Sequence, residues 1–160
     1  MWPTLAKGLL LALLPIGHAQ ACWDAAGARH GVSPALLYAI ARVESDLDCT
    51  AVNRSHFKVT GTYDIGCMGI NSSHLPRLQK RGVSERDLFN PCTNIDFGAE
   101  ILADLFHRRG ISWDTIGAYN AACTKLSEDA CRAARSRYAW RVYCYLYTNR
   151  SCPRPGTRKR

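Results

Sequence analysis

The chain contains the stretch Ser33-Pro34-Ala35-Leu36-Leu37-Tyr38-Ala39-Ile40-Ala41-Arg42-Val43-Glu44-Ser45, which predicts a helix with a clear start. Ser33 is a favourable N-cap residue, and Pro34 suits the first helical turn, where its missing N–H is not needed. The apolar face of this helix consists of Leu37, Ile40 and Ala41. At roughly 100° per residue, Glu44 falls on that same face near the end of the helix.

Glu44 is therefore the first candidate for a reactive side chain. Burial without a cationic partner disfavours an ionised carboxyl and raises its pKa, and a Glu whose pKa lies near neutrality suits a general acid and base. A structural role is the alternative, in which Glu44 lies at the edge of the apolar face and is held by a local N–H or an arginine. The pattern alone leaves both open.

The first nineteen residues have the pattern of a secretory signal peptide. Lys7 supplies the positive charge, a short apolar run follows, and small residues suit cleavage after Ala19 or after Ala21. Cleavage after Ala21 would make Cys22 the first residue of a lipoprotein, but Ala19 and Gln20 fit that motif poorly. The apolar run is short for a membrane span. We expect a periplasmic protein with no transmembrane segment in its mature chain.

Eight cysteines behind a signal peptide predict an oxidising compartment and four disulfides. Zinc binding is the alternative, but the sequence has no Cys-x-x-Cys pair and no histidine pair at ligand spacing, so we expect no metal and no cofactor. Eight cysteines can pair in 105 ways, which the sequence does not resolve. The pairing that we favour is Cys22–Cys92, Cys49–Cys67, Cys123–Cys131 and Cys144–Cys152.

The formal net charge is +8, and removal of Lys7 with the signal peptide leaves +7. No Asp or Glu follows Asp129, whereas eight arginines and one lysine do. Such a surface attracts polyanions over long range, and outside the cytoplasm these are cell-wall polymer and anionic lipid. No nucleic-acid motif is present, so we expect no nucleic-acid partner. Residues 149–160 are interpreted as a solvated basic tail.

Residues 20–148 predict one mostly helical domain with a small extended lobe. Periodic apolar residues and cap residues predict further helices at 23–30, 75–80, 91–109, 113–120 and about 130–147. Ser84 and Asp87 form a capping pair for one more turn. Between residues 49 and 72, glycines and β-favouring side chains predict a loop or small hairpin. The last helix carries Tyr138, Trp140, Tyr143, Tyr145 and Tyr147, most of which we expect in the core.

Three motifs follow one another along the chain. They are Glu44-Ser45, then Gly66-Cys67-Met68-Gly69-Ile70-Asn71 about twenty residues later, then Gly117-Ala118-Tyr119-Asn120 about fifty residues after that. In this order and spacing they resemble the lytic transglycosylase family of the soluble, lysozyme-like type. The likeness is greatest to the small periplasmic members that accompany type III and type IV secretion, conjugation and pili. It covers Cys22 to about Tyr145, with further fragments at 22–27, 62–66, 70–72, 90–92 and 138–139. It implies a lysozyme-like α+β fold, mainly helical, whose small lobe borders a saccharide cleft.

The resemblance also implies roles for individual residues. The catalytic glutamate of the family falls on Glu44. The substrate-binding positions fall on Ser45, Met68, Gly69, Asn71, Tyr119, Asn120 and Tyr138. Two positions depart from the family pattern, because Cys67 stands in place of leucine and Gly69 in place of glutamine. The first fits a disulfide, and the second removes an amide from the cleft; we expect activity to survive both changes.

The implied reaction cleaves the β-1,4 bond between N-acetylmuramic acid and N-acetylglucosamine in peptidoglycan and leaves a 1,6-anhydro end. One carboxylate acts as acid and then as base, whereas most glycosidases use two. Asp64 is the candidate for a second carboxylate, although a turn aspartate more often bonds its own backbone. The alternative functions are a hydrolytic muramidase of the same fold and a wall-binding component without turnover. The implied partners are glycan strands and the envelope machine that the protein serves, and we expect a monomer.

Overall fold

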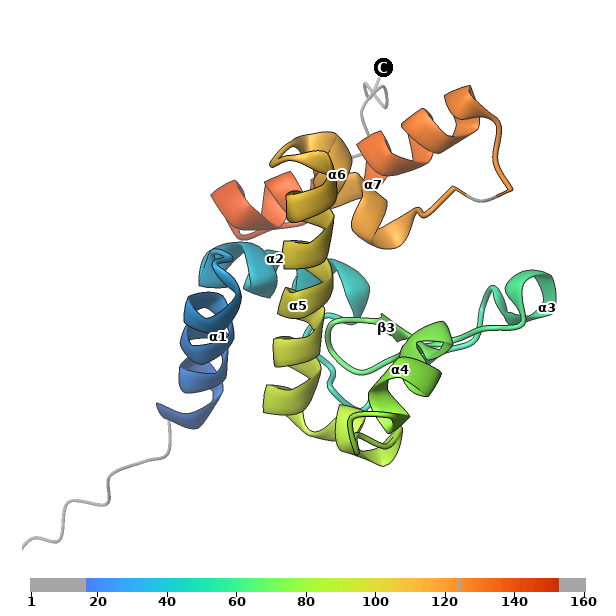
Figure 1. Ribbon diagram of the computed structural model, residues 1–160. Coiled ribbons are helices and arrows are strands. Elements are labelled where there is room, and N and C mark those ends of the chain that lie inside the picture. Colours follow the sequence, from blue (N-terminus) through green and yellow to red (C-terminus); the bar gives the residue numbers. More distant parts are fainter. Residues whose placement is uncertain (1–16, 124, 153–160) are drawn as a thin grey trace, which may run out of the picture.

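The computed structural model describes residues 17–123 and 125–152 (Figure 1). Its α-helices are α1 (Gly17–His30), α2 (Pro34–Glu44), α3 (Phe57–Thr60), α4 (Leu75–Gln79), α5 (Pro91–Arg109), α6 (Trp113–Asn120) and α7 (Glu128–Thr148). The 3-10 helices are η1 (Ser72–His74) and η2 (Arg86–Phe89), and the strands are β1 (Val52–Asn53), β2 (Asp64–Ile65) and β3 (Ile70–Asn71). The predicted fold class, a mainly helical domain with a small extended lobe, is confirmed.

The long helix α5 runs through the molecule, with α1 along one side and the small lobe on the other (Figure 1). α2 packs against α7, and α6 also packs against α7. The fully buried side chains include Leu37, Ile40, Ile65, Met68, Leu102 and Val142. The contact between the lobe and α5 is close, because a Cβ at Gly98 would lie 2.8 Å from atoms of the Met68 side chain.

The small lobe is an antiparallel sheet in the order β1-β2-β3. Val52 pairs with Ile65 in the first ladder, and Asp64 pairs with Asn71 in the second. The single turn of α3 lies at the tip of the β1–β2 connection and projects from the body of the molecule (Figure 1). The sequence did not predict α3, which ends at Thr60 and is followed by the C-cap Gly61 with a left-handed φ of +70°.

Side-chain caps begin three helices, and the first of them, Ser33, is a cap that the sequence predicts. Ser33 Oγ accepts a hydrogen bond from Leu36 N at 3.4 Å, and Asn90 Oδ1 accepts from Thr93 N at 3.2 Å. Ser112 Oγ accepts from Thr115 N at 3.1 Å. Each cap satisfies a backbone N–H that the first helical turn leaves without an intrahelical partner. Local chemistry therefore sets where α2, α5 and α6 begin.

The two ends of the chain differ from the predicted helix bounds. α1 begins at Gly17, ahead of the expected start at Trp23, and α7 begins at Glu128 with Ser127 as its cap. The predicted cleavage positions therefore fall within α1. Residues 1–16 and 153–160, which include most of the predicted signal peptide and basic tail, lie outside the described residues, so both remain predictions.

The aromatic residues of α7 correct one expectation. Trp140, Tyr143 and Tyr147 are exposed, whereas the sequence analysis placed most of this set in the core. The helix presents Tyr138 and Val142 to its neighbours and turns these three rings to the opposite face, because residues three, four and seven apart share one side of a helix. A helix rich in aromatics thus has two different faces.

Four disulfides join the elements, namely Cys22–Cys92, Cys49–Cys67, Cys123–Cys131 and Cys144–Cys152. These are the four pairs that the sequence analysis favoured. The first joins α1 to the start of α5, and the second joins the segment after α2 to the small lobe. No helix among residues 17–123 and 125–152 combines the length and apolar character needed to cross a membrane.

Candidate active site

Glu44 is the last residue of α2, and the packing of that helix sets the environment of its carboxyl. The side chains of Leu37, Ile40 and Ala41 are wholly buried on the same face. Burial disfavours the ionised carboxyl and raises the pKa of Glu44 from 4.5 to about 7. The apolar face that the sequence predicted is therefore the cause of a carboxyl that titrates near neutral pH.

Tyr138 holds this carboxyl from α7. Its hydroxyl donates to Glu44 Oε1 at 2.5 Å, which stabilises the carboxylate and lowers the pKa of Glu44 against the larger effect of burial. Arg141, which also donates to Val43 O at 2.8 Å, lowers that pKa as well. Burial and the charge of Glu44 raise the pKa of Tyr138 well above its usual range. The Tyr138 hydroxyl is therefore a donor at every physiological pH.

The loop from Gly66 to Gly69 lies against the other carboxyl oxygen. Gly69 N donates to Gly66 O at 3.0 Å and closes a tight turn. Gly69 has a φ of +59°, and a Cβ at this position would lie 2.7 Å from Glu44 Oε2. Glycine adopts this conformation without strain and leaves room for the oxygen. The family pattern has glutamine at this position, whereas in this chain the main chain of Gly69 lies directly against the Glu44 carboxyl.

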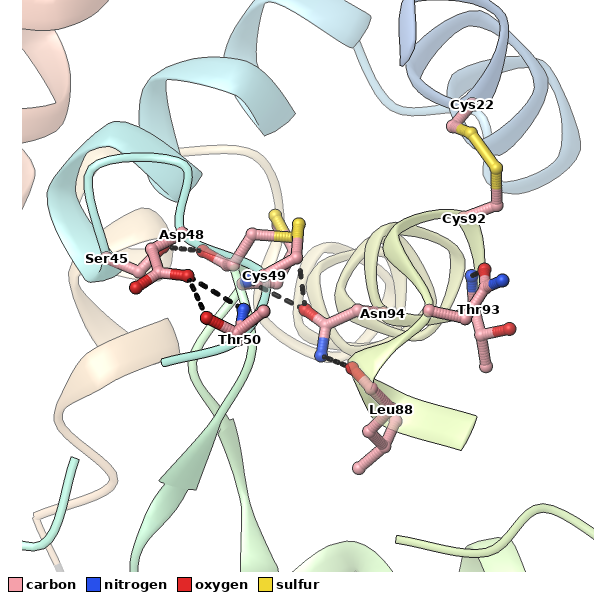
Figure 2. The surroundings of a disulfide bond; sticks show 12 residues. Cys22, Ser45, Asp48, Cys49, Thr50, Leu88, Cys92, Thr93 and Asn94 are labelled. Atoms are coloured by element: carbon pink, nitrogen blue, oxygen red, sulfur yellow. Dashed lines mark hydrogen bonds between the residues drawn. A yellow bond between two sulfur atoms is a disulfide. The ribbon is translucent and has the colours of Figure 1, made fainter. Parts of the chain in front are cut away.

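Asn94, from the first turns of α5, fixes that loop in place. Its Nδ2 donates to Ile65 O at 3.0 Å and to Leu88 O at 2.8 Å, and its Oδ1 accepts from Met68 N at 2.8 Å. Figure 2 shows the bond from Asn94 to Leu88 beside the Cys49 disulfide. A Cβ at Gly66, whose φ is +73°, would lie 2.1 Å from Asn94 Nδ2. The buried amide of Asn94 therefore fits only beside a glycine, and the loop keeps its conformation through the hydrogen bonds of that amide.

Sequence reasoning missed Asn94. A signal was present, since Asn94 lies four residues before Gly98 on the apolar face of α5. A wholly buried polar side chain on such a face needs hydrogen-bond partners, and these are most often backbone groups of a neighbouring segment. Arg141 was missed as well, because its contact with the end of α2 joins residues 98 positions apart in sequence.

Two hydroxyls bind carbonyls of the same loop. Ser45 Oγ donates to Cys67 O at 3.0 Å, and Tyr119 Oη donates to Met68 O at 2.9 Å. Burial and the charge of Glu44 raise the pKa of Tyr119 well above its usual range, so its hydroxyl also stays protonated. The Met68 side chain is wholly buried, and its backbone is the part that contacts Tyr119. Ser45 and Tyr119 thus position the loop beside Glu44.

Asp64 lies in β2, opposite Asn71 of β3. Asp64 Oδ1 accepts from Asn71 Nδ2 at 2.8 Å and lies 3.6 Å from His56 Nε2. The negative charge of Asp64 raises the pKa of Glu44, so the two carboxyl groups interact electrostatically. Asp64 is therefore bound to a cross-strand amide at the edge of the Glu44 site.

The structure gathers most of the predicted site residues around one carboxyl. These are Ser45, Asp64, Met68, Gly69, Tyr119 and Tyr138 around Glu44. Asn71 lies one step further out, since its amide binds Asp64. Asn120 differs, since it is exposed at the end of α6. The described residues contain no group of three His, Cys, Asp or Glu side chains that could hold a metal ion. In such a site Glu44 can give up and take back one proton, while the surrounding tyrosines stay neutral and the backbone stays fixed.

The chain is similar to several known proteins. The family model described as the Transglycosylase SLT domain matches residues 21–139. Invasion protein IagB of Salmonella typhi is 38% identical over 137 residues, which cover 84% of this chain and 81% of that protein. Protein IpgF of Shigella flexneri is 36% identical over 137 residues, covering 84% and 85%. A putative peptidoglycan-binding-like protein of Escherichia coli (strain K12) is 43% identical over 132 residues, covering 79% and 81%.

The fold is also similar to a solved structure. The X-ray structure of an inactive mutant of lytic transglycosylase Slt from Pseudomonas aeruginosa has a TM-score of 0.62 and 20% sequence identity. The match covers 82% of this chain and 24% of that chain, so this chain spans about a quarter of that protein. The family model covers most of the sequence, and the relatives are similar over most of their length. The chain therefore belongs to the transglycosylase SLT family, the family of peptidoglycan lytic transglycosylases.

Proposed function

We propose that Glu44 cleaves the β-1,4 bond between N-acetylmuramic acid and N-acetylglucosamine, first as an acid and then as a base. One observation supports this most: the Glu44 carboxyl has a pKa of about 7 and is held between the Tyr138 hydroxyl and the backbone of Gly69. Both protonation states are then populated near neutral pH. A residue that gives one proton and takes another needs both states within reach.

The reaction has two steps. In the first, protonated Glu44 gives its proton to the glycosidic oxygen, the bond from that oxygen to C1 breaks, and the electron pair stays on the leaving oxygen. The acetamido oxygen of the muramyl residue stabilises the cation at C1. In the second step, the Glu44 carboxylate takes the proton of the C6 hydroxyl, whose oxygen bonds to C1 and closes the 1,6-anhydro ring. Glu44 ends protonated, and no water is consumed.

The neighbours of Glu44 suit this two-step reaction. The Tyr138 hydroxyl donates to Oε1 and stabilises the carboxylate that exists between the two steps. Arg141 adds positive charge that favours the same state. Burial favours the protonated state that begins and ends the cycle. These opposing effects hold the carboxyl pKa at about 7 instead of far above it.

Digestion of purified sacculi by the mature chain, followed by mass spectrometry, tests this proposal. We expect products with anhydro ends, one water lighter than the products of hydrolysis. Glu44→Gln should lower turnover by about a hundredfold or more and leave the far-UV circular dichroism spectrum unchanged. Asp46→Asn is the matched control, because this exposed carboxylate is two residues away and should not alter turnover. Full activity of Glu44→Gln would contradict the proposal, and binding without any turnover by the native chain would indicate a wall-binding component.

A hydrolytic muramidase is the second candidate, because the charge of Asp64 acts on Glu44. In that reaction Asp64, or a water molecule that it activates, would attack C1, and the product would gain one water. Asp64→Asn should then abolish turnover. In the transglycosylase reaction the same substitution only lowers the pKa of Glu44, because one negative charge beside it is removed, and turnover continues.

We also propose that the protein acts in the periplasm and opens the wall locally for an envelope-spanning secretion, conjugation or pilus machine. Similarity to Invasion protein IagB of Salmonella typhi and the four disulfides support this proposal. Deletion of the gene should reduce assembly of the machine and leave growth unchanged. Complementation with the native chain, but not with Glu44→Gln, should restore assembly.

A further inference from the structure

The face of α7 opposite Tyr138 carries a cluster of exposed aromatic rings. Trp140, Tyr143 and Tyr147 follow one another at helical spacing, and Trp113 joins them from the start of α6. We call these four residues the aromatic platform. Their side chains are between 37% and 65% exposed. Exposed aromatic clusters of this kind mark binding surfaces more often than solitary apolar residues do.

The rings of the aromatic platform contact one another. Trp140 and Tyr143 stack with planes 8° apart and centroids 5.4 Å apart. Trp113 meets Tyr143 edge-on at 5.5 Å, and Tyr147 lies 4.7 Å from Tyr143. Tyr143 is therefore the centre of the cluster. Because each ring is held by its neighbours, little side-chain entropy is lost when a ligand covers them.

A hollow of about 480 Å³ lies beside the aromatic platform, between α6 and α7. Trp113, Trp140 and Tyr143 form its aromatic wall, and Asp114, Arg132 and Ser136 supply its polar groups. Ligand sites typically have volumes of roughly 300–1,000 Å³ and combine aromatic walls with a few placed polar groups. An aromatic face packs against the C–H face of a pyranose ring, while a carboxylate, a guanidinium and a hydroxyl bind its hydroxyl groups. This combination suits a sugar.

The hollow is separate from the Glu44 site. Tyr138, which contacts Glu44, is two residues from both Ser136 and Trp140. At roughly 100° per residue, a separation of two places them on the opposite side of α7. A glycan in the hollow would therefore be a different stretch of polymer, or a different strand, from the one at Glu44.

Charge at this end of the molecule favours an anionic polymer. Helix α7, which carries most of the aromatic platform, has four arginines and only two acidic residues. Peptidoglycan carries carboxylates on its peptide stems, so it combines the sugar rings and the negative charge that this surface fits.

We propose that the aromatic platform and its hollow form a second binding site for peptidoglycan glycan, which holds the wall while Glu44 acts on another stretch. This proposal rests on peptidoglycan being the substrate. Two sites on one chain raise the effective concentration of glycan at Glu44. The second site therefore matters for insoluble sacculi and has no effect on a soluble oligosaccharide too short to reach it.

Cosedimentation with purified sacculi tests the proposal without turnover, in a chain that carries Glu44→Gln. Adding Tyr143→Ala or Trp113→Ala should weaken sacculus binding about tenfold. Tyr143→Phe, which keeps the ring, should retain binding. Leu126→Ala is the matched control, because Leu126 is an exposed large apolar residue outside the aromatic platform.

In the active chain, the same alanine substitutions should slow the digestion of sacculi and leave cleavage of a soluble glycan tetrasaccharide unchanged. Unchanged sacculus binding by both alanine variants would overturn the proposal. So would a dimer in analytical ultracentrifugation that Tyr143→Ala converts to a monomer, because a second copy would then be the occupant. If binding depends on the aromatic platform but no anhydro products form, the second site stands and the proposed reaction is wrong. The failure of one proposal can therefore be told from the failure of the other.

Discussion

Glu44 makes the stability of the folded chain depend on pH. Its pKa is about 7 in the folded state and 4.5 without the surrounding structure. Between these values the folded state binds the proton more tightly than the unfolded state does, so the free energy of unfolding falls as pH rises. Below pH 4.5 the folded chain keeps the whole of this contribution to its stability. Above about pH 7 the contribution is lost, and the loss amounts to roughly 3 kcal/mol at 1.36 kcal/mol per pKa unit.

Glu44→Gln should remove this dependence. At pH 8 the variant should be more stable than the native chain by up to about 3 kcal/mol, because a neutral amide replaces a buried carboxylate. At pH 4, where native Glu44 is protonated, the two chains should have nearly equal stability. Urea denaturation at both pH values measures the difference. A difference that is the same at pH 4 and pH 8 would contradict the assigned cause.

Tyr138→Phe tests the hydrogen bond to the carboxyl. The Tyr138 hydroxyl lowers the pKa of Glu44, so its removal should raise that pKa further. In the pH–rate profile for sacculus digestion, the fall in rate on the alkaline side should move to higher pH, with a lower maximum. Tyr145→Phe is a suitable control, since Tyr145 lies on α7 and contacts Arg42 instead of Glu44. An unshifted profile in Tyr138→Phe would indicate that another group controls the alkaline limb.

The loop between β2 and β3 is held beside the end of α2 by hydrogen bonds to its main chain and by the Cys49–Cys67 disulfide. Ser45, Tyr119 and Asn94 all bind main-chain groups of this loop. Its glycines have positive φ where other residues are strained. The element that completes the site is thus a turn whose shape is fixed by side chains from the C-cap of α2, from α5 and from α6.

Gly69→Ala and Gly82→Ala separate backbone strain from contact with Glu44. Both glycines have positive φ, +59° and +75°, so each alanine should cost about 1 kcal/mol of stability. A Cβ at Gly82 has no neighbour within 4 Å, whereas a Cβ at Gly69 would press on Glu44 Oε2. Turnover should therefore fall about a hundredfold in Gly69→Ala only. Equal turnover in the two variants would show that the close approach is unimportant.

The elements that could be predicted from sequence are those with local signals. Ser33, Asn90 and Ser112 begin helices because each side chain bonds a backbone N–H within three residues. The exposed face of α7 could not be predicted, because aromatic residues occur on both sides of that helix and its packing against α2 and α6 selects which side is buried. α3 gave no periodic signal, because it is a single turn.

The disulfides stabilise the whole molecule by restricting the conformations of the unfolded chain. Loop closure predicts the largest effect for Cys22–Cys92, which spans 70 residues, then for Cys49–Cys67, which spans 18, and the smallest for Cys144–Cys152, which spans 8. Paired Cys→Ala substitutions should lower stability by about 4, 3 and 2.5 kcal/mol in that order. Thermal unfolding by calorimetry measures the series. An order unrelated to loop length would indicate that native contacts, and not the unfolded chain, dominate.

The sequence by itself determined the mainly helical class, the starts of α2, α5 and α6, and a carboxyl on an apolar face, because these depend on residues close together in the chain. Only the tertiary structure decided the pKa of that carboxyl, the tyrosine that holds it and the amide that shapes the loop beside it. Tyr138 lies 94 residues from Glu44, and Asn94 lies 26 residues from Met68. Such pairs meet only when helices pack, and the loss of water at their meeting point raises the pKa of Glu44.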